Sequence, residues 1–114
     1  MKPRVFVVQD QRVRRGVLLV SKFDLTPASV FGDLVFVLSP DARPYHAQSV
    51  IDEIHQNIRS ITTKDHVLLV GNPVLIGWVT AIAAYYLKGN VRCLQWEQLK
   101  KSYIPVSGEL FAFS

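Results

Sequence analysis

The sequence predicts an α/β protein whose mixed sheet has a three-stranded parallel core, an N-terminal β-hairpin and a C-terminal antiparallel strand. Three apolar segments of strand length alternate with two segments of helix length, which is the pattern of two successive βαβ crossovers. Short apolar runs at both ends flank this alternation. With 114 residues, the chain has the size of a single domain, 1–114.

The strand at 67–70 and the helix at 73–87 have the clearest local signals. Asn72 is a preferred N-cap residue, and Pro73 suits the first position of a helix, where no N–H is needed. Gly89 readily adopts the left-handed conformation that ends a helix, and Lys88 places a positive charge at the negative end of the helix dipole. The start and stop signals therefore agree on one βα unit.

The segments before this unit are assigned from their hydrophobic patterns. Residues 4–8 and 17–20 are two β-branched runs joined by a polar segment that ends in glycine, which predicts a hairpin. Residues 21–33 predict a loop with one helical turn at 27–30, anchored on the core by Phe23, Leu25 and Phe31. The continuous apolar run 34–38 predicts a strand covered on both faces.

A helix is predicted to begin at Pro44, because the residue before a proline disfavours the helical region. Its apolar residues recur at helical spacing and form one stripe, so this helix should lie on the sheet with its other face in water. The members of the stripe are Ala47, Val50, Ile51, Ile54, Ile58 and Ile61.

The helix at 73–87 is apolar on nearly every side, which means that most of its surface must be covered. A chain of this size has little material to cover two faces of one helix, so the excess predicts a homo-oligomer, such as a homodimer. Coverage by the N-terminal hairpin and the 21–33 loop is the alternative. The candidate interface residues are Val74, Trp78, Ile82 and Tyr85.

The C-terminal segments predict strands at 91–96 and 102–106 joined by the polar turn 97–101. Pro105 requires an edge position, because proline cannot donate a ladder hydrogen bond. Residues 110–113 then form a short tail that docks or pairs.

The basic charge is concentrated at the N-terminal end. Residues 1–22 contain six basic residues and one acidic residue, whereas the rest of the chain has seven basic and eight acidic residues. This distribution favours nucleic acid or an acidic protein as a partner there, and a solvated hairpin turn is the alternative. The candidate contacts are Arg12, Arg14, Arg15 and Lys22.

Several other classes of protein are disfavoured by the composition. Residues 67–87 carry no charge, but the Gly-Asn-Pro turn within the first third argues against a membrane helix, and the N-terminus lacks the pattern of a signal peptide. One cysteine, Cys93, excludes an internal disulfide and predicts a buried, inert thiol. The histidines show no metal-ligand spacing, and we expect no cofactor.

The strand ends offer one candidate ligand site. In open α/β sheets, ligands bind beyond the carboxyl ends of the strands. The residues expected there are Ser39, Asp41, Arg43, His46, Gly71 and Asn72. They suit a nucleotide or phosphate, although GNPVLIG matches neither a dinucleotide loop nor a P-loop and each residue also has a structural explanation. Hydrolysis using Ser39 or His46 is a remoter alternative, and no catalytic residue is assigned.

The chain between Asp24 and Val106 resembles a family of small tailed-bacteriophage proteins. The similarity rests on DLTPA, VLLVGNPVLIG, AIAA followed by glycine, LQWE and YIPV. No activity is attached to that family, so the resemblance implies no residue roles. It implies a protein of the infected bacterium's cytoplasm that binds host nucleic acid or a host protein. Together with the patterns above, it favours a non-catalytic binding module.

Overall fold

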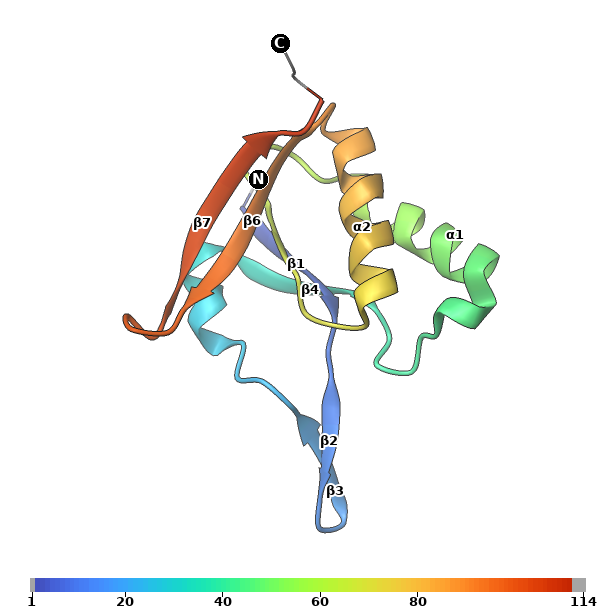
Figure 1. Ribbon diagram of the computed structural model, residues 1–114, viewed down its shortest axis with the longest axis vertical. Helices are drawn as coiled ribbons and strands as arrows, with labels where there is room; N and C mark the ends of the chain where they lie inside the picture. Colours follow the sequence, from blue (N-terminus) through green and yellow to red (C-terminus); the bar gives the residue numbers. More distant parts are fainter. Residues whose placement is uncertain (1, 112–114) are drawn as a thin grey trace.

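The computed structural model describes residues 2–111 and contains a five-stranded sheet with two α-helices on one face (Figure 1). The strands lie in the order β4 (Asp33–Leu38), β1 (Arg4–Gln9), β5 (His66–Leu68), β6 (Asn90–Glu97) and β7 (Ser102–Glu109). The first four are parallel neighbours, and β7 pairs with β6 in the antiparallel sense. The predicted fold class is confirmed. No helix in the described range is long and apolar enough to cross a membrane.

The central strand is β1, and its predicted pairing was wrong. We expected residues 4–8 to form a hairpin with residues 17–20, but β1 lies between β4 and β5 and adds a fourth strand to the parallel part. The side chains from Val5 to Val8 are all 0% exposed. Burial of four consecutive residues requires cover on both faces, which a central strand has and a hairpin at the margin lacks.

Both helices pack on the same face of the sheet. Helix α1 (Ala47–Ile58) follows a short 3-10 turn, η2 (Pro44–His46), and its predicted stripe points inward through Val50, Ile54 and Ile58. Helix α2 (Pro73–Tyr86) buries Leu75, Val79, Ala83 and Ala84. These side chains and the sheet residues Phe6, Val8, Val67 and Val91 form the larger of two hydrophobic clusters.

The predicted ends of α2 are confirmed. The side-chain oxygen of Asn72 accepts hydrogen bonds from the amides of Val74 at 2.9 Å and Leu75 at 3.4 Å, which satisfies two donors of the first turn. At the other end, Gly89 has a φ of +87°. The helix therefore begins and stops where its local sequence dictates.

The opposite face of the sheet is covered only in part. The 3-10 helix η1 (Thr26–Phe31) packs there, and Leu25 and Ala28 are buried with Val5, Val7, Leu68 and Leu94 in the second cluster. The predicted helical turn and the anchoring roles of Leu25 and Phe31 are confirmed. That of Phe23 is wrong, because its side chain is 44% exposed.

Strand β4 is an edge strand rather than a strand covered on both faces. It pairs with β1 on one side only, and the Phe36 side chain is 46% exposed. A continuous apolar run does not distinguish an edge from a centre, because that choice is made by distant segments. At the other margin, β7 is an edge strand that contains Pro105, as predicted.

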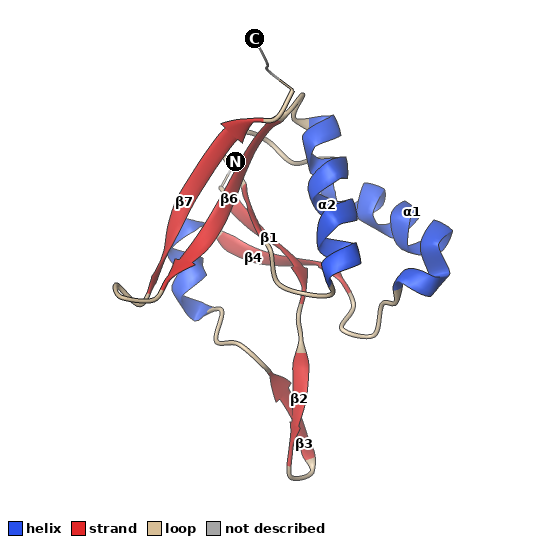
Figure 2. Cartoon of the chain, viewed as in Figure 1, coloured by secondary structure: helices blue, strands red, loops and turns tan. Residues whose placement is uncertain are grey.

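Strands β2 (Arg12–Arg15) and β3 (Leu18–Ser21) form a separate two-stranded sheet. We refer to residues 12–21 as the arm. The arm extends away from the body of the molecule (Figures 1 and 2). Its turn contains Gly16 with a φ of +64°, a conformation that favours glycine. The N-terminal hairpin therefore exists, although it is built from a later part of the chain than expected.

The start of the C-terminal tail pairs with Gly89, in the turn between α2 and β6. The amide of Leu110 donates to the carbonyl oxygen of Gly89 at 2.7 Å, and a Cβ added at Gly89 would lie 2.8 Å from the Phe111 ring. The predicted pairing of the tail is thus seen at Leu110, while the side chains of Leu110 and Phe111 are 56% and 58% exposed. The rest of that prediction, up to Phe113, lies outside the described residues.

Candidate functional site

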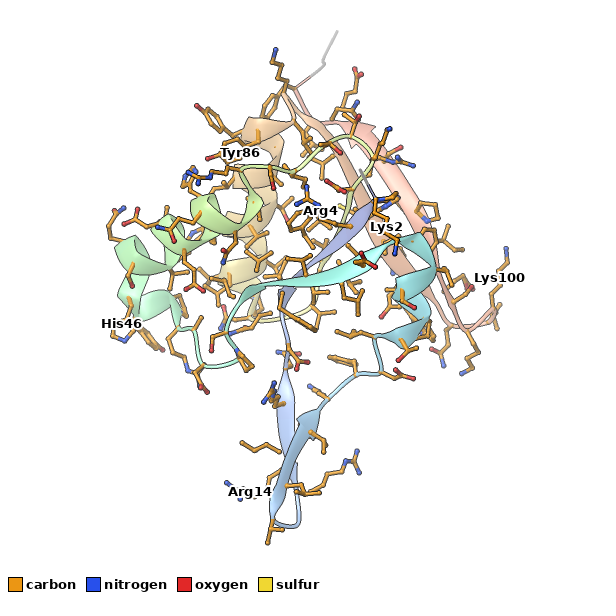
Figure 3. All side chains as sticks on the ribbon, turned by 180° about the vertical axis from the view of Figure 1, so that it is seen from behind. Lys2, Arg4, Arg14, His46, Tyr86 and Lys100 are labelled. Carbon is orange, nitrogen blue, oxygen red and sulfur yellow. The ribbon has the colours of Figure 1, made fainter. Side chains whose placement is uncertain are left out.

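The arm gathers the basic residues that the sequence singled out. Arg12, Arg14, Arg15 and Lys22 are all exposed, and Figure 3 shows Arg14 near the far end of the arm. Arg12 forms an ion pair with Asp10, with Nε and Oδ2 separated by 3.2 Å. Among residues 2–111, no ion pair joins Arg14 or Arg15 to a carboxylate. The end of the arm therefore carries uncompensated positive charge.

The two faces of the arm differ in chemistry. Residues directly opposite each other in an antiparallel pair share a face, and successive residues alternate between faces. Val13 pairs with Val20 and Arg15 pairs with Leu18, so these four side chains lie on one face, which we call the apolar face. The other face, which we call the basic face, carries Arg12, Arg14 and Leu19.

The arm also exposes large apolar side chains. Val17 is 91% exposed, Leu18 64% and Leu19 59%. At its base, the amide of Lys22 donates to the carbonyl oxygen of Gln11 at 2.6 Å, and the Lys22 ammonium lies 5.3 Å from the Phe23 ring centroid. An isolated two-stranded hairpin is marginally stable in water. A free arm with this much exposed hydrocarbon is the kind of surface that partners cover.

The strand ends meet at a position where ligands often bind. The chain runs from β1 to β4 on one side and then returns to β5 on the other, which makes the β1–β5 boundary a topological switch point. Here the buried side chain of Gln9 occupies the space. Its Nε2 donates to the carbonyl oxygens of Ser39, Pro40 and Ala42 at 3.0–3.3 Å. Its Oε1 accepts from the Asn72 amide at 3.1 Å.

The predicted strand-end residues are mostly engaged in holding their own loops. Ser39 Oγ accepts from the Asp41 amide, and Arg43 Nη1 donates to the carbonyl oxygens of Pro40 and Ala42. Asn72 caps α2. His46 is exposed at the start of α1, and its side chain makes no capping bond there. Gly71 has a φ of +140°, and a Cβ there would lie 2.8 Å from the Cβ of Gln9.

The structure brings only part of that set together. Arg43 and Asn72 line a depression of about 230 Å³, which Arg12 at the base of the arm also lines. Ser39 lines a neighbouring depression of about 250 Å³ with Arg12 and Glu53. Both are smaller than the 300–1,000 Å³ typical of small-molecule sites. The strand ends therefore suit at most a small anion.

A larger cleft lies on the partly covered face of the sheet. It has a volume of about 690 Å³ and is formed by the ends of β5 and β6, the segment before η1, and Tyr103 of β7. The Trp96 and Tyr103 rings meet edge to face with centroids 5.0 Å apart, and Trp96 Nε1 donates to Gln98 Oε1. Trp96 is 37% exposed and Leu69 is 40% exposed. We call this the aromatic cleft.

Among the described residues, Asp24 is the only charged one that lines the aromatic cleft. Hydrogen bonds from Thr26 lower the pKa of Asp24, so its carboxylate is charged at neutral pH. Burial raises the pKa of Tyr103, and the negative charge of Asp24 raises it further. The aromatic cleft was not among the predicted sites, because its walls come from distant segments of the chain. The cross-strand aromatic pair in LQWE and YIPV was the available signal.

Helix α2 presents an apolar stripe to solvent. Val74, Gly77, Ala81 and Tyr85 are exposed and follow one another at helical spacing, with Val74 46% and Tyr85 70% exposed. Trp78 and Ile82, also predicted for an interface, are partly buried against the core. The arm projects away from the body, and the 21–33 segment packs on the opposite face of the sheet, so the stripe lacks the cover that the alternative prediction gave it.

Two further ionisable side chains, Asp65 and His66, are buried at the start of β5. Burial lowers the pKa of His66, and the nearby Arg92 charge lowers it further, against the opposing effect of Asp65. Burial would raise the pKa of Asp65, but hydrogen bonds from Thr62 and Arg4 and the charge of Arg4 lower it overall. At neutral pH, His66 is therefore uncharged and the Asp65 carboxylate is charged.

The sulfur and metal chemistry of the described region is limited. Cys93 is a partly buried free thiol, and burial raises its pKa, so it is largely protonated and unreactive at neutral pH. Within residues 2–111, no group of three or more His, Cys, Asp or Glu side chains is arranged to hold a metal ion.

A family model described as "Phage Pam3 gp32-like protein" matches residues 3–110, and so includes the arm, the sheet and both helices. No curated protein matches the chain. No solved structure matches it either.

Proposed function

We propose that this chain, which belongs to the phage Pam3 gp32-like protein family, is a non-catalytic binding module that contacts nucleic acid through the basic face of its arm. The observation that carries the proposal is the free-standing arm with Arg12 and Arg14 on one face. A bacteriophage protein of this kind would act in the cytoplasm of the infected cell.

The shape and charge of the arm support duplex nucleic acid as the partner. The major groove of DNA admits a two-stranded β-ribbon, and the arm is such a ribbon. Arg12, Arg14 and the adjacent Lys22 supply positive charges for backbone phosphates, which bind with no dependence on sequence. Contacts of this kind position a protein on the duplex without reading its bases, so we expect binding without strong sequence preference.

The test compares charge reversal on the arm with a matched reversal elsewhere. Lys100 is an exposed base on the β6–β7 turn, well away from Arg14 (Figure 3). Fluorescence anisotropy with a labelled DNA duplex should give a dissociation constant of roughly 10⁻⁴ to 10⁻⁶ M for the native chain. Arg14→Glu should weaken binding about tenfold and reduce the salt slope by about one. Lys100→Glu should change neither quantity by as much.

Three outcomes would contradict nucleic-acid binding by the arm. They are no binding of the duplex, an equal loss of affinity in both variants, and competition by polyglutamate as strong as that by unlabelled duplex. The second outcome would assign the attraction to net charge alone. The third would favour an acidic protein as the partner.

We also propose that the chain self-associates through the exposed stripe of α2. An apolar stripe on the solvent side of a surface helix is the reverse of the usual pattern, and Gly77 and Ala81 leave its centre flat enough for close approach of a second helix. Ala81→Glu should preserve the helix, since Glu is a good helix former, and should lower the mass measured by analytical ultracentrifugation. Gln56→Glu, on the exposed side of α1, is the control. An unchanged mass in Ala81→Glu would refute this interface.

A ligand site at the strand ends is less well supported. Gln9 fills the switch point with hydrogen bonds to three carbonyl oxygens and one amide. The remaining depression with Arg12, Arg43 and Asn72 suits phosphate rather than a nucleotide. A thermal-shift series with inorganic phosphate and nucleotides tests it, because a ligand that binds the folded state raises the melting temperature.

A further inference from the structure

We infer that the apolar face of the arm docks in the aromatic cleft of a second copy of this chain, and that the second copy returns the same contact. A second copy is the expected partner because each chain carries both the arm and the cleft, and these two surfaces are complementary. This docking goes beyond nucleic-acid binding and does not depend on it.

The two surfaces match in hydrophobic character. The arm offers Val17 and Leu18 with little cover, and the rim of the cleft offers Phe23, Leu69 and Trp96, each 37–44% exposed. Apolar surface removed from water on both sides contributes about 25 cal/mol per Å². Neither surface pairs with or is filled by another part of the described chain, since the arm forms a sheet of its own and the cleft is open.

The two surfaces also match in charge. The apolar face of the arm carries one base, Arg15, which has no ion-pair partner in the described part of the chain. The cleft is lined by one charged residue, the carboxylate of Asp24, although the chain as a whole has a net charge of +4. A guanidinium suits a site that combines a carboxylate with aromatic rings. Arg15 is thus the base expected opposite Asp24.

The position of the arm permits a reciprocal exchange. Gln11 and Phe23, which flank the arm at its base, themselves line the cleft. Arm and cleft are therefore neighbours on the surface, and a two-fold axis beside them brings each arm to the other subunit's cleft, as an isologous interface requires. Such a docking leaves the basic face, with Arg12 and Arg14, turned outward.

Ultracentrifugation of charge variants is the first test. It is run in the Ala81→Glu background, so that association through α2 does not contribute. Arg15→Glu should raise the dimer dissociation constant about tenfold or more. Asp24→Asn, which keeps an oxygen that can accept from the Thr26 amide, should do the same with a smaller effect. The double variant Arg15→Glu with Asp24→Lys should regain most of the affinity, because the pair is restored with its signs exchanged.

Cysteine cross-linking is the second test, in a Cys93→Ser background. Val17→Cys on the arm and Gln98→Cys at the cleft, prepared as separate chains of different mass and mixed, should form a mixed disulfide dimer. Val17→Cys mixed with Lys88→Cys, which lies just after the C-terminal end of α2, should not. Because each chain carries one cysteine, this disulfide reports contact between chains only.

Fluorescence provides a third measurement that does not depend on charge. The chain has two tryptophans, so Trp78→Phe leaves Trp96 as the sole reporter. Its emission should shift to the blue as concentration rises, and Leu18→Ser should abolish the shift. Leu18 is exposed in the single chain, so this substitution leaves the fold intact.

The inference is overturned by any one of three results. They are a monomer at micromolar concentration in the Ala81→Glu background, a double charge variant no better than the single ones, or equal cross-linking at Lys88→Cys. A chain carrying both Val17→Cys and Gln98→Cys that oxidises only within itself would show that the arm closes on its own cleft. Loss of duplex binding in Arg14→Glu leaves all these readouts unchanged, so the two proposals fail separately.

Discussion

The two antiparallel hairpins of this protein carry similar residues and are held in different ways. The β6–β7 hairpin has eight residues in each strand, and β6 also pairs with β5, so that hairpin forms one end of the five-stranded sheet. The arm has four residues in each strand and pairs only with itself. Both have bases near the turn. The difference teaches that local sequence makes a hairpin, whereas neighbouring strands decide whether it becomes part of the core.

The exposure of a leucine in each hairpin shows this difference most directly. Leu94 in β6 is 4% exposed and packs in the cluster under η1, whereas Leu19 in β3 is 59% exposed. The arm therefore retains hydrocarbon that contributes little to the folding of a single chain. That surplus is our reason for assigning the arm to binding rather than to stability.

The largest expected effect comes from the same substitution made in both hairpins. Leu94→Ala should lower the free energy of unfolding by about 2–5 kcal/mol, because it removes buried methyl groups and leaves a cavity. Leu19→Ala should change it by less than about 0.5 kcal/mol, as is usual for exposed positions. Chemical denaturation monitored by circular dichroism measures both. Comparable losses in the two variants would mean that the arm packs on the body.

A smaller effect is expected at the junction between body and arm. Gln9 is the last residue of β1, is 4% exposed and ties two loops through its side chain. Gln9→Ala should cost about 1–3 kcal/mol of unfolding free energy, since it leaves buried polar groups without partners. Gln11→Ala, two residues along, should cost much less, because its side chain is partly exposed at the cleft. Equally small losses of unfolding free energy in the two variants would contradict the role of the Gln9 side chain in holding the two loops.

The smallest effect concerns pH and should be confined to the body. The pKa of His66 is lowered in the folded state, so the unfolded chain binds more protons and stability falls as pH drops below the ordinary value of 6.5. The pKa of Asp65 is also lowered in the folded state, so its contribution to stability is lost as the pH falls below the ordinary value of 3.8. His66→Phe should remove the upper part of this dependence in thermal melts. A wild-type melt that is flat between pH 7 and 5 would contradict the assignment.

The arm should not share this dependence. Residues 12–21 contain no histidine, so the charge of the arm stays constant through the range in which His66 titrates. Duplex binding measured at pH 5.5 and 7.5 should therefore agree, provided that the body remains folded at both. The two regions are thus separable by titration as well as by substitution.

The helices could be predicted from the sequence because their signals are local. Asn72 and Pro73 start α2, and its stop at Gly89 lies three residues beyond the last helical residue. The stripe of α1 needed only its own spacing. The same is true of the turn at η1 and of the edge position of Pro105, since each depends on the preferences of a few adjacent residues.

The strand pairing and the sites could not be predicted in the same way. β1 and residues 17–20 are both β-branched runs. Their local sequences do not indicate that one lies in the centre of a sheet and the other on a free arm. The exposed position of Phe23 has the same origin. The aromatic cleft needed Asp24, Trp96 and Tyr103 to be brought together from separate segments, which no spacing in the chain reveals.

The sequence by itself determined the class of fold, the limits of α2, the basic character of the N-terminal end and the surplus of apolar surface. Only the tertiary structure decided that β1 lies at the centre of the sheet, that the arm stands free with two unlike faces, and that a cleft opens on the side where η1 is short. The physical reason is the range of the interactions. Capping, turn chemistry and periodicity act between residues a few positions apart, whereas burial and strand pairing are settled by competition among segments far apart in the chain.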